Sequence, residues 1–232
     1  MIFIIIIAAI ILVVVFGYFG WLAAKKRRDA LSQLARKLGW SFSPASDRSH
    51  DEEYAHFEIF RRGHSRAAYN TLWGTLEIHG ATCAAKAGDF TYKVTSSNGK
   101  TTTTTTYHFS YLILHLPYPR VPDLIIRPEG FFDKFAGAIG FDDIDFESVD
   151  FSRKFFVKSP DKRHAYDVIH ARMMEFLLET RPVCVDMEHG RCCMSDGAKR
   201  WEPQQFEDTI DWLRRFFDLW PEHVVRDLAV RS

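Results

Sequence analysis

The chain has 232 residues, with 30 basic and 30 acidic side chains and no formal net charge at pH 7. Charges of both signs are mixed along it, and the single basic run at residues 25–28 is short, so the composition argues against nucleic-acid binding. The cysteines have no regular spacing, which favours a reducing compartment over a disulfide framework. They are Cys83, Cys184, Cys192 and Cys193. Roughly 200 residues follow the basic run, enough to bury one ordinary core.

An uncharged apolar stretch opens the chain and ends at Lys25-Lys26-Arg27-Arg28. About 24 residues at ~1.5 Å each give ~36 Å of helix, longer than the ~30 Å hydrocarbon core of a bilayer. Tyr18 and Trp21 precede the basic run by one turn, where amphipathic rings prefer lipid headgroups. The sequence therefore predicts a transmembrane anchor, with residues 2–24 in the lipid bilayer. A cleaved signal peptide or a buried core helix fits less well, because no Lys or Arg precedes the run and every face is apolar.

The basic run also predicts an orientation, since basic residues flanking a span stay on the cytoplasmic side. We therefore expect a single-pass protein with Met1 outside and everything after Arg28 in the cytoplasm. The predicted domains are the anchor with its basic flank at 1–28, a juxtamembrane amphipathic helix and connector at 29–48, and a cytoplasmic domain at 49–232.

Hydrophobic spacing predicts the elements of that domain in chain order. Residues 29–38 form an amphipathic helix ended by Gly39, residues 40–44 alternate like a strand, and the acidic segment at 47–53 opens a short helix. Extended runs separated by Gly, Asn and Pro then predict strands at 67–76, 81–95, 101–116 and 124–127.

The second half of the chain mixes helices with shorter strands. Predicted helices run through 131–139, from Ser159-Pro160-Asp161 to about residue 177, and through 206–220. Predicted strands lie at 151–159 and in a hairpin over 183–194 that turns at His189-Gly190. Strands gathered first and helices mainly later predict an α+β fold: an antiparallel sheet with helices packed on one face, after the transmembrane helix.

Ser97-Asn98-Gly99-Lys100 is the strongest turn signal, and it favours a two-residue hairpin loop. The threonine run Thr101–Thr106 follows; it favours extended structure but offers no apolar face. We therefore expect a hairpin arm that projects into solvent, with a hydroxyl-rich binding surface as the alternative. Counting outward from this turn places Asp89 opposite His108, the one acid–imidazole pair that the sequence lets us place. Asp89 should then raise the pKa of His108. The pair is our candidate for catalysis; a partly exposed ion pair is the alternative.

Short motifs between Phe57 and Asp161 form two groups. The first is Phe57–Gly63, Asn70–Gly74 and Asp89–Tyr92, with Gly99-Lys100 after it; the second is Arg127–Gly130, Asp143–Phe146 and Phe151–Phe155. Together they resemble an uncharacterised bacterial family of membrane-anchored proteins, known as a domain of unknown function. The resemblance implies a bacterial source and an N-terminal anchor, hence an inner (plasma) membrane location, and it supplies no catalytic residue.

Cys184, His189, Cys192 and Cys193 invite a zinc hypothesis, because thiolate and imidazole are preferred zinc ligands. A turn at His189-Gly190 would pair Met187 with Cys192 and Asp186 with Cys193, and would point the adjacent cysteines to opposite sides of the strand. These cysteines are better interpreted as ordinary strand residues.

The acidic stretch at residues 142–150 could offer Asp143, Asp145 and Glu147 to a divalent cation. It lacks calcium-loop spacing and a glycine at the bend. We favour a segment fixed by Ile144, Phe146 and Phe151, with its acids in solvent and facing Arg153 or Lys154.

No phosphate-binding glycine loop, paired metal-ligand histidines or nucleophile elbow occurs in the sequence. We therefore expect no cofactor and no metal. The favoured function is a protein-interaction or scaffolding module at the inner membrane, with an unidentified protein partner. The alternatives are a membrane-tethered enzyme, most plausibly a hydrolase with a site on the β-sheet, and a domain that supports oligomerisation.

Overall fold

The computed structural model describes residues 2–118, 120–129 and 144–230, and in the first helix the side-chain description leaves out positions 2, 4, 5, 8 and 9. The elements in chain order are α1 (Ile2–Leu38), β1 (Ser41–Ser43), α2 (His50–Glu53), the 3₁₀ helix η1 (Glu58–Arg61), β2 (His64–Ile78), β3 (Ala81–Ser97), β4 (Thr102–His115), β5 (Leu124–Pro128), α3 (Val149–Lys154), β6 (Phe155–Lys158), α4 (Lys162–Val168), α5 (Ala171–Thr180), β7 (Cys184–Glu188), β8 (Arg191–Ser195), α6 (Pro203–Asp218) and α7 (Glu222–Val230). The strands form one eight-stranded sheet in the order β1-β2-β3-β4-β8-β7-β5-β6. Every neighbouring pair is antiparallel, which confirms the α+β prediction.

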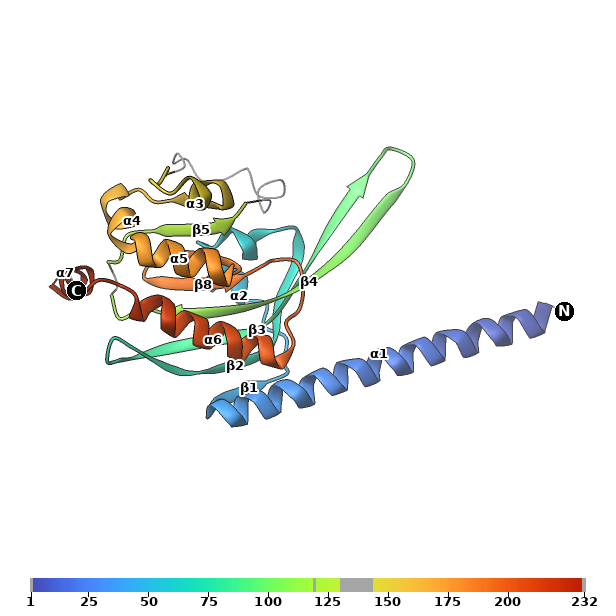
Figure 1. The fold of residues 1–232 in the computed structure, drawn as a ribbon. Coiled ribbons are helices and arrows are strands. Elements are labelled where there is room, and N and C mark those ends of the chain that lie inside the picture. The colour runs from blue at the N-terminus through green and yellow to red at the C-terminus, as the bar shows by residue number, and fades with distance from the viewer. Residues whose placement is uncertain (1, 119, 130–143, 231–232) are drawn as a thin grey trace.

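Both faces of the sheet carry an apolar layer. On one, which we call the helical face, α5 and α6 lie across the strands (Figure 1), together with the C-terminal part of α1. On the other, the aromatic face, the segment containing α2 and η1 packs its rings on β3 and β4. The rings buried there are Tyr54, Phe57, Phe60, Phe90, Phe109 and Tyr111. Helices on one face alone were predicted; the second layer is needed because β3 and β4 also direct large aromatic side chains to the other side.

Helix α1 is continuous over 37 residues, so the predicted anchor and the predicted amphipathic helix are one element. Leu31, Leu34 and Ala35 are buried, as their spacing predicted, and Gly39 follows the helix with a φ of +70°. The N-terminal part extends away from the domain (Figure 1). Its described large apolar side chains are 43% to 81% exposed, from Leu22 to Phe3.

The prediction of a transmembrane helix is wrong: among the residues described, no helix is long and apolar enough to cross a membrane. Three further predictions depended on that span and are corrected with it: residues 2–24 in a bilayer, Met1 outside, and a single-pass inner-membrane location with a cytoplasmic domain. The basic run, which we interpreted as a headgroup flank, belongs in part to the fold, because Arg27 reaches the buried carboxylate of Asp89.

The strands of the long hairpin form as predicted, but its register was wrong by two residues. Ser97 pairs with Thr102, so the loop contains four residues. Asn98 Oδ1 accepts hydrogen bonds from the backbone N–H groups of Lys100 and Thr101, at 3.1 and 2.8 Å, and this side-chain bonding lengthens the loop. The arm beyond Lys93 is exposed and projects from the domain (Figure 1), as the sequence predicted.

The second half follows the sequence with local changes. The predicted strand at 151–159 begins as α3, because the side chain of Ser148 caps the N–H of Phe151, and only β6 is extended. Asp161, two residues later than the expected Ser159, caps α4. Strands β7 and β8 have the predicted register, and α6 buries the predicted face. The predicted helix at 131–139 lies outside the described residues.

Candidate functional site

Asp89 forms the centre of a buried polar cluster on the helical face. Arg27 donates two hydrogen bonds to it, from Nε to Oδ2 at 2.7 Å and from Nη2 to Oδ1 at 2.6 Å. The Ser110 hydroxyl donates to Oδ1 at 2.7 Å, and Asn70 Nδ2 donates to Oδ2 at 3.0 Å. The Asp89 side chain is fully buried and that of Arg27 is 12% exposed. Each oxygen of the Asp89 carboxylate therefore accepts two hydrogen bonds from this chain.

Local backbone geometry builds this cluster. Strand β2 has an irregularity between Tyr69 and Leu72, and Asn70 adopts a φ of +50° there. Such a bulge redirects a side chain, and here it aims the Asn70 amide at Asp89. Arg27 also donates to the carbonyl of Trp201 at 3.0 Å, next to the start of α6. The cluster thus fixes α1 to both the sheet and the α6 connection.

The candidate catalytic pair is not brought together in the structure. Asp89 pairs across the strands with Ser110, and His108 pairs with Thr91. His108 Nδ1 lies 3.1 Å from the Tyr69 hydroxyl. Burial and the positive charge of Arg200 lower the pKa of His108, against the attraction of Asp89, so the predicted rise in this pKa is wrong. Asp89 binds Arg27 in place of an imidazole.

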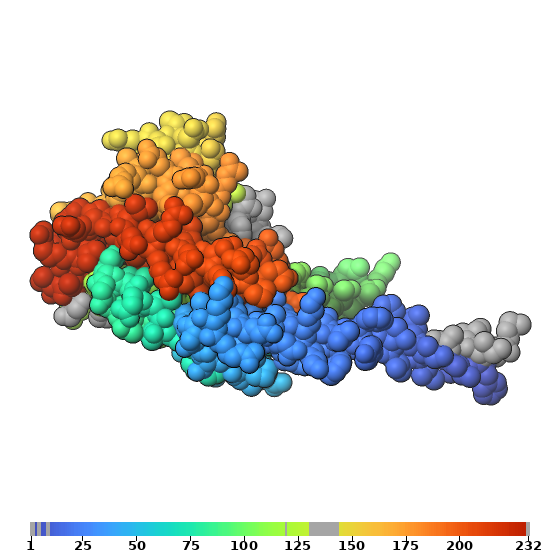
Figure 2. All heavy atoms as spheres, turned by 60° about the horizontal axis from the view of Figure 1, so that its bottom comes forward, coloured from blue at the N-terminus to red at the C-terminus, as the bar shows by residue number. Residues whose placement is uncertain are grey.

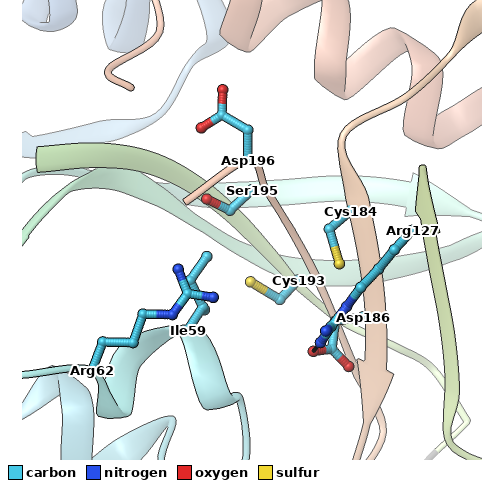
Figure 3. Close-up of a pocket in the computed structure, with 8 residues that line it drawn as sticks. All are labelled: Ile59, Arg62, Arg127, Cys184, Asp186, Cys193, Ser195 and Asp196. Atoms are coloured by element: carbon cyan, nitrogen blue, oxygen red, sulfur yellow. Dashed lines mark ion pairs between the residues drawn. The ribbon is translucent and has the colours of Figure 1, made fainter. Parts of the chain in front are cut away.

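A second polar cluster lines a cavity on the aromatic face (Figure 3). The cavity holds about 20 Å³, room for one water molecule and far below the roughly 300 Å³ of a ligand pocket. Its polar lining comes from Arg62, Arg127, Cys184, Asp186, Cys193, Ser195 and Asp196. Arg127 approaches Asp186 only to 3.9 Å, measured from Nη2 to Oδ2. Asp186 Oδ1 is buried and accepts no hydrogen bond from any described residue.

Burial weakens two acids of strand β7, Asp186 of the cavity lining and Glu188. It raises the pKa of Asp186 to about 7, although Arg127 attracts the charged form. Burial also raises the pKa of Glu188 to about 8, helped by the negative charges of Asp186 and Asp123. The two carboxyl groups lie two residues apart on one strand face. The carboxyl groups of Asp186 and Glu188 should therefore stay partly protonated near neutral pH.

Strands β7 and β8 carry three free cysteines, Cys184, Cys192 and Cys193. Cys192 is buried on the helical face and Cys193 on the aromatic face, so the adjacent pair points to opposite sides, as predicted. Burial raises the pKa of the Cys184 thiol to about 12, which makes it a poor thiolate ligand or nucleophile. Among the described residues, no three side chains of the His, Cys, Asp or Glu type gather to hold a metal ion.

The described part of the acidic stretch is arranged as the sequence predicted. Ile144, Phe146 and Phe151 are buried. Asp145 and Glu147 are exposed, and Asp150 lies 3.0 Å from the guanidinium of Arg153. Asp142 and Asp143 lie outside the described residues.

Most of the large apolar side chains that are exposed among the described residues lie on the first part of α1. In Figure 2 this part extends beyond the rest of the molecule, while the C-terminal part of α1 lies against α6. Its described side chains include Phe3, Ile10, Val13, Phe16 and Phe19, all more than half exposed. The sequence reveals the apolar run but not the contact of Arg27 with Asp89 that holds α1 to the domain. Arg27 lies inside a basic run, and nothing in the sequence distinguishes it from its neighbours.

Comparisons with known proteins complete the description. No family model matches the chain, and no curated protein matches it. The crystal structure of the mycobacterial trehalose monomycolate transport factor A, TtfA, is similar, with a TM-score of 0.51 and 14% sequence identity. The similarity covers 84% of this chain and 96% of that one. At this identity the similarity establishes a shared fold.

Proposed function

We propose that this chain is a non-catalytic interaction module that serves as an accessory component of a lipid-transport system. The observation that carries the proposal is the first part of α1, a row of exposed apolar side chains outside the domain. Contiguous apolar surface of this extent marks an interaction site, because its exposure to water is costly. The partner is a protein of that system with an apolar surface complementary to the helix.

The anchoring of α1 supports an interaction role. Two charge-assisted hydrogen bonds from Arg27 to Asp89 and one hydrogen bond to the Trp201 carbonyl fix the helix where it leaves the domain. Leu31, Leu34 and Ala35 pack the following turns into the core. A helix held in this way presents its free end in one direction, which lowers the entropy lost when a partner binds.

The lipid-transport assignment is supported by the fold shared with TtfA, a trehalose monomycolate transport factor. The resemblance to an uncharacterised bacterial family, drawn from motifs between Phe57 and Asp161, stays a prediction, as does the hydrolase alternative. The cavity at Asp186 is too small to hold a substrate.

Site-specific photocrosslinking in cells tests the proposal. p-Benzoylphenylalanine replaces Phe16, which is 68% exposed on α1, in the full-length chain. We expect an adduct with one defined protein whose depletion impairs lipid export. The matched control places the same probe at Tyr166, which is 48% exposed on α4, where no such adduct should form.

Two further results decide the outcome. Replacing Phe19 by serine in the Phe16 probe variant should reduce the adduct several-fold, because an adjacent apolar contact is lost. Equal adduct yields at positions 16 and 166, or an adduct partner without any link to lipid export, would overturn the proposal.

A further inference from the structure

Strand β4 changes neighbours along its length. Leu112 to His115 pair with β8, and the N–H of Leu116 donates to the Gly190 carbonyl at 2.8 Å. The N–H of Ser110 donates to the Lys199 carbonyl at 3.0 Å, where the chain after β8 turns away. From Thr102 to His108, no described strand pairs with this edge of β4. The arm therefore has an open edge in line with β8.

The register identifies the backbone groups on that edge. In an antiparallel ladder, alternate residues direct both N–H and C=O to the same neighbour. Ser110 and Leu116 direct their N–H groups toward the β8 side, so even-numbered residues face that side. Thr102, Thr104, Thr106 and His108 follow the same alternation along the arm. These four residues present unpaired donors and acceptors to a further strand.

This edge lacks the features that usually prevent strand addition. Charged side chains, prolines and bulges protect natural edges. Residues 101–107 contain no charge and no proline, and the β3–β4 ladder is regular over the arm. The opposite edge of the arm is shorter, because His64 of β2 pairs with Lys93. An added strand therefore fits β4 better than β3.

One face of the arm also offers apolar surface to a neighbour. Val94 and Tyr107 are 39% and 43% exposed. They point to the aromatic face, the same side as Phe90 and Phe109, and the ring of Tyr107 stacks on that of Tyr92 at 5.1 Å. A strand beside β4 would cover part of this surface. The threonines of the even positions point to the other side.

We propose that the open edge of β4 binds a second copy of this chain, with the two arms antiparallel about a two-fold axis at Thr105. The threonine run makes the edge self-complementary, because Thr104 of one copy then faces Thr106 of the other. Thr103 faces Tyr107 and covers its ring. The run is uncharged, so identical edges meet without like-charge repulsion. This surface is separate from α1 and does not depend on the proposed function.

A disulfide placed on the two-fold axis tests the pairing in the full-length chain. Thr105 would face its own copy in a non-hydrogen-bonded pair, with a Cα separation of roughly 4.5 Å that a disulfide spans. We expect most of the Thr105→Cys protein to run as a covalent dimer after mild oxidation. Thr95→Cys is the control, at a position that is also exposed and lies on β3 of the same arm. It should give at least roughly tenfold less dimer, because its strand lies away from the axis.

Proline substitution tests the edge itself. Thr104→Pro removes one outward N–H, and an edge strand tolerates proline there. It should reduce disulfide dimerisation of the Thr105→Cys protein about tenfold. Thr95→Pro removes an outward N–H from the β3 edge and should leave the dimer yield unchanged.

Three results would overturn the proposal: equal yields from Thr105→Cys and Thr95→Cys, a dimer that persists in Thr104→Pro, or a disulfide to a different protein when the variant is oxidised in cells.

Discussion

Two buried arginine–aspartate pairs lie on opposite faces of the same sheet, and they differ in how completely the carboxylate is hydrogen-bonded. On the helical face, Asp89 accepts from Arg27, Asn70 and Ser110 at 2.6 to 3.0 Å. On the aromatic face, Asp186 lies 3.9 Å from Arg127, and one of its oxygens accepts no hydrogen bond from the described residues.

The difference concerns how far the protein replaces the hydrogen bonds that a carboxylate makes with water. Proximity to an arginine is insufficient at Asp186, where burial raises the pKa to about 7. A carboxylate removed from water must recover its hydrogen bonds from the protein, and a long contact recovers little. We therefore assign the Asp89 pair a structural role, fixing α1. For the Asp186 pair we expect a contribution to the pH dependence of stability.

Replacing Arg27 by alanine should have the largest effect, because it leaves the carboxylate of Asp89 buried and without its cation. We expect a loss of roughly 3 to 5 kcal/mol in the free energy of unfolding, the range for breaking a buried ion pair. Urea denaturation of the full-length chain measures it.

Truncation tests the same contact. Removal of residues 2–24 retains Arg27, whereas removal of residues 2–28 also deletes it and should destabilise the domain far more.

The matched control for Arg27→Ala is Lys37→Ala on the same helix. Lys37 Nζ contacts Glu207 at 2.6 Å, but its side chain is 67% exposed. Solvent screens such a pair, so the loss should stay below about 1 kcal/mol. Similar losses for the two variants would contradict the structural role of the Arg27–Asp89 pair.

The Asp186 cluster should make unfolding pH-dependent in a defined direction. Because the pKa of Asp186 is about 7 in the fold and about 4 in the unfolded chain, the native state binds more protons between these values. The free energy of unfolding should therefore fall as pH rises from about 4 toward 8, the upper end being set by the pKa of Glu188 at about 8. The slope is at most about 1.4 kcal/mol per pH unit for each extra proton.

Denaturation of Asp186→Asn between pH 5 and pH 8 isolates this contribution. The amide cannot ionise, so the variant should show a shallower slope and gain stability relative to the unmodified chain at the upper end of the range. A pH slope unchanged by the substitution would assign the titration to other groups.

A comparison of two hairpins, β7–β8 and β3–β4, explains why part of the fold was predictable. In β7–β8, His189 and Gly190 both adopt positive φ, of 52° and 72°, which closes a two-residue loop and gives the predicted register. At Ser97 to Thr102 the same rule failed, because Asn98 used its side chain to cap two backbone N–H groups and enlarged the loop. Alternation located the strands in both hairpins, but the conformation of each loop set the register.

The contacts within the polar clusters could not be predicted from the sequence, for a related reason. Arg27 and Asp89 are 62 positions apart, and their contact requires the bulge in β2, the register of β3–β4 and the docking of α1 at once. Apolar faces follow from local periodicity, so Leu31 and Leu34 were predicted to be buried. A buried ion pair has no comparable period in the sequence.

The smallest effect is expected at His108, and it tests how far the charge of Asp89 extends beyond its cluster. His108 lies on the same sheet face as Asp89, two residues along the strand from Ser110. Burial lowers the pKa of His108; the positive charge of Arg200 lowers it further, and Asp89 partly compensates. NMR titration of the imidazole in the full-length chain should thus show a pKa below the ordinary histidine value of about 6.5.

Two substitutions separate the charges acting on His108. Arg200→Gln should raise the pKa of His108, and Asp89→Asn should lower it by a smaller amount, because the charge of Arg200 acts on the imidazole more strongly than that of Asp89. Asn keeps the size of the carboxylate, and circular dichroism would confirm that the variant is folded. If Asp89→Asn moved this pKa more than Arg200→Gln, the carboxylate would be poorly neutralised by Arg27. The contrast between the two buried pairs would then be one of degree, and Asp89 would regain its place as a candidate for acid–base chemistry with His108.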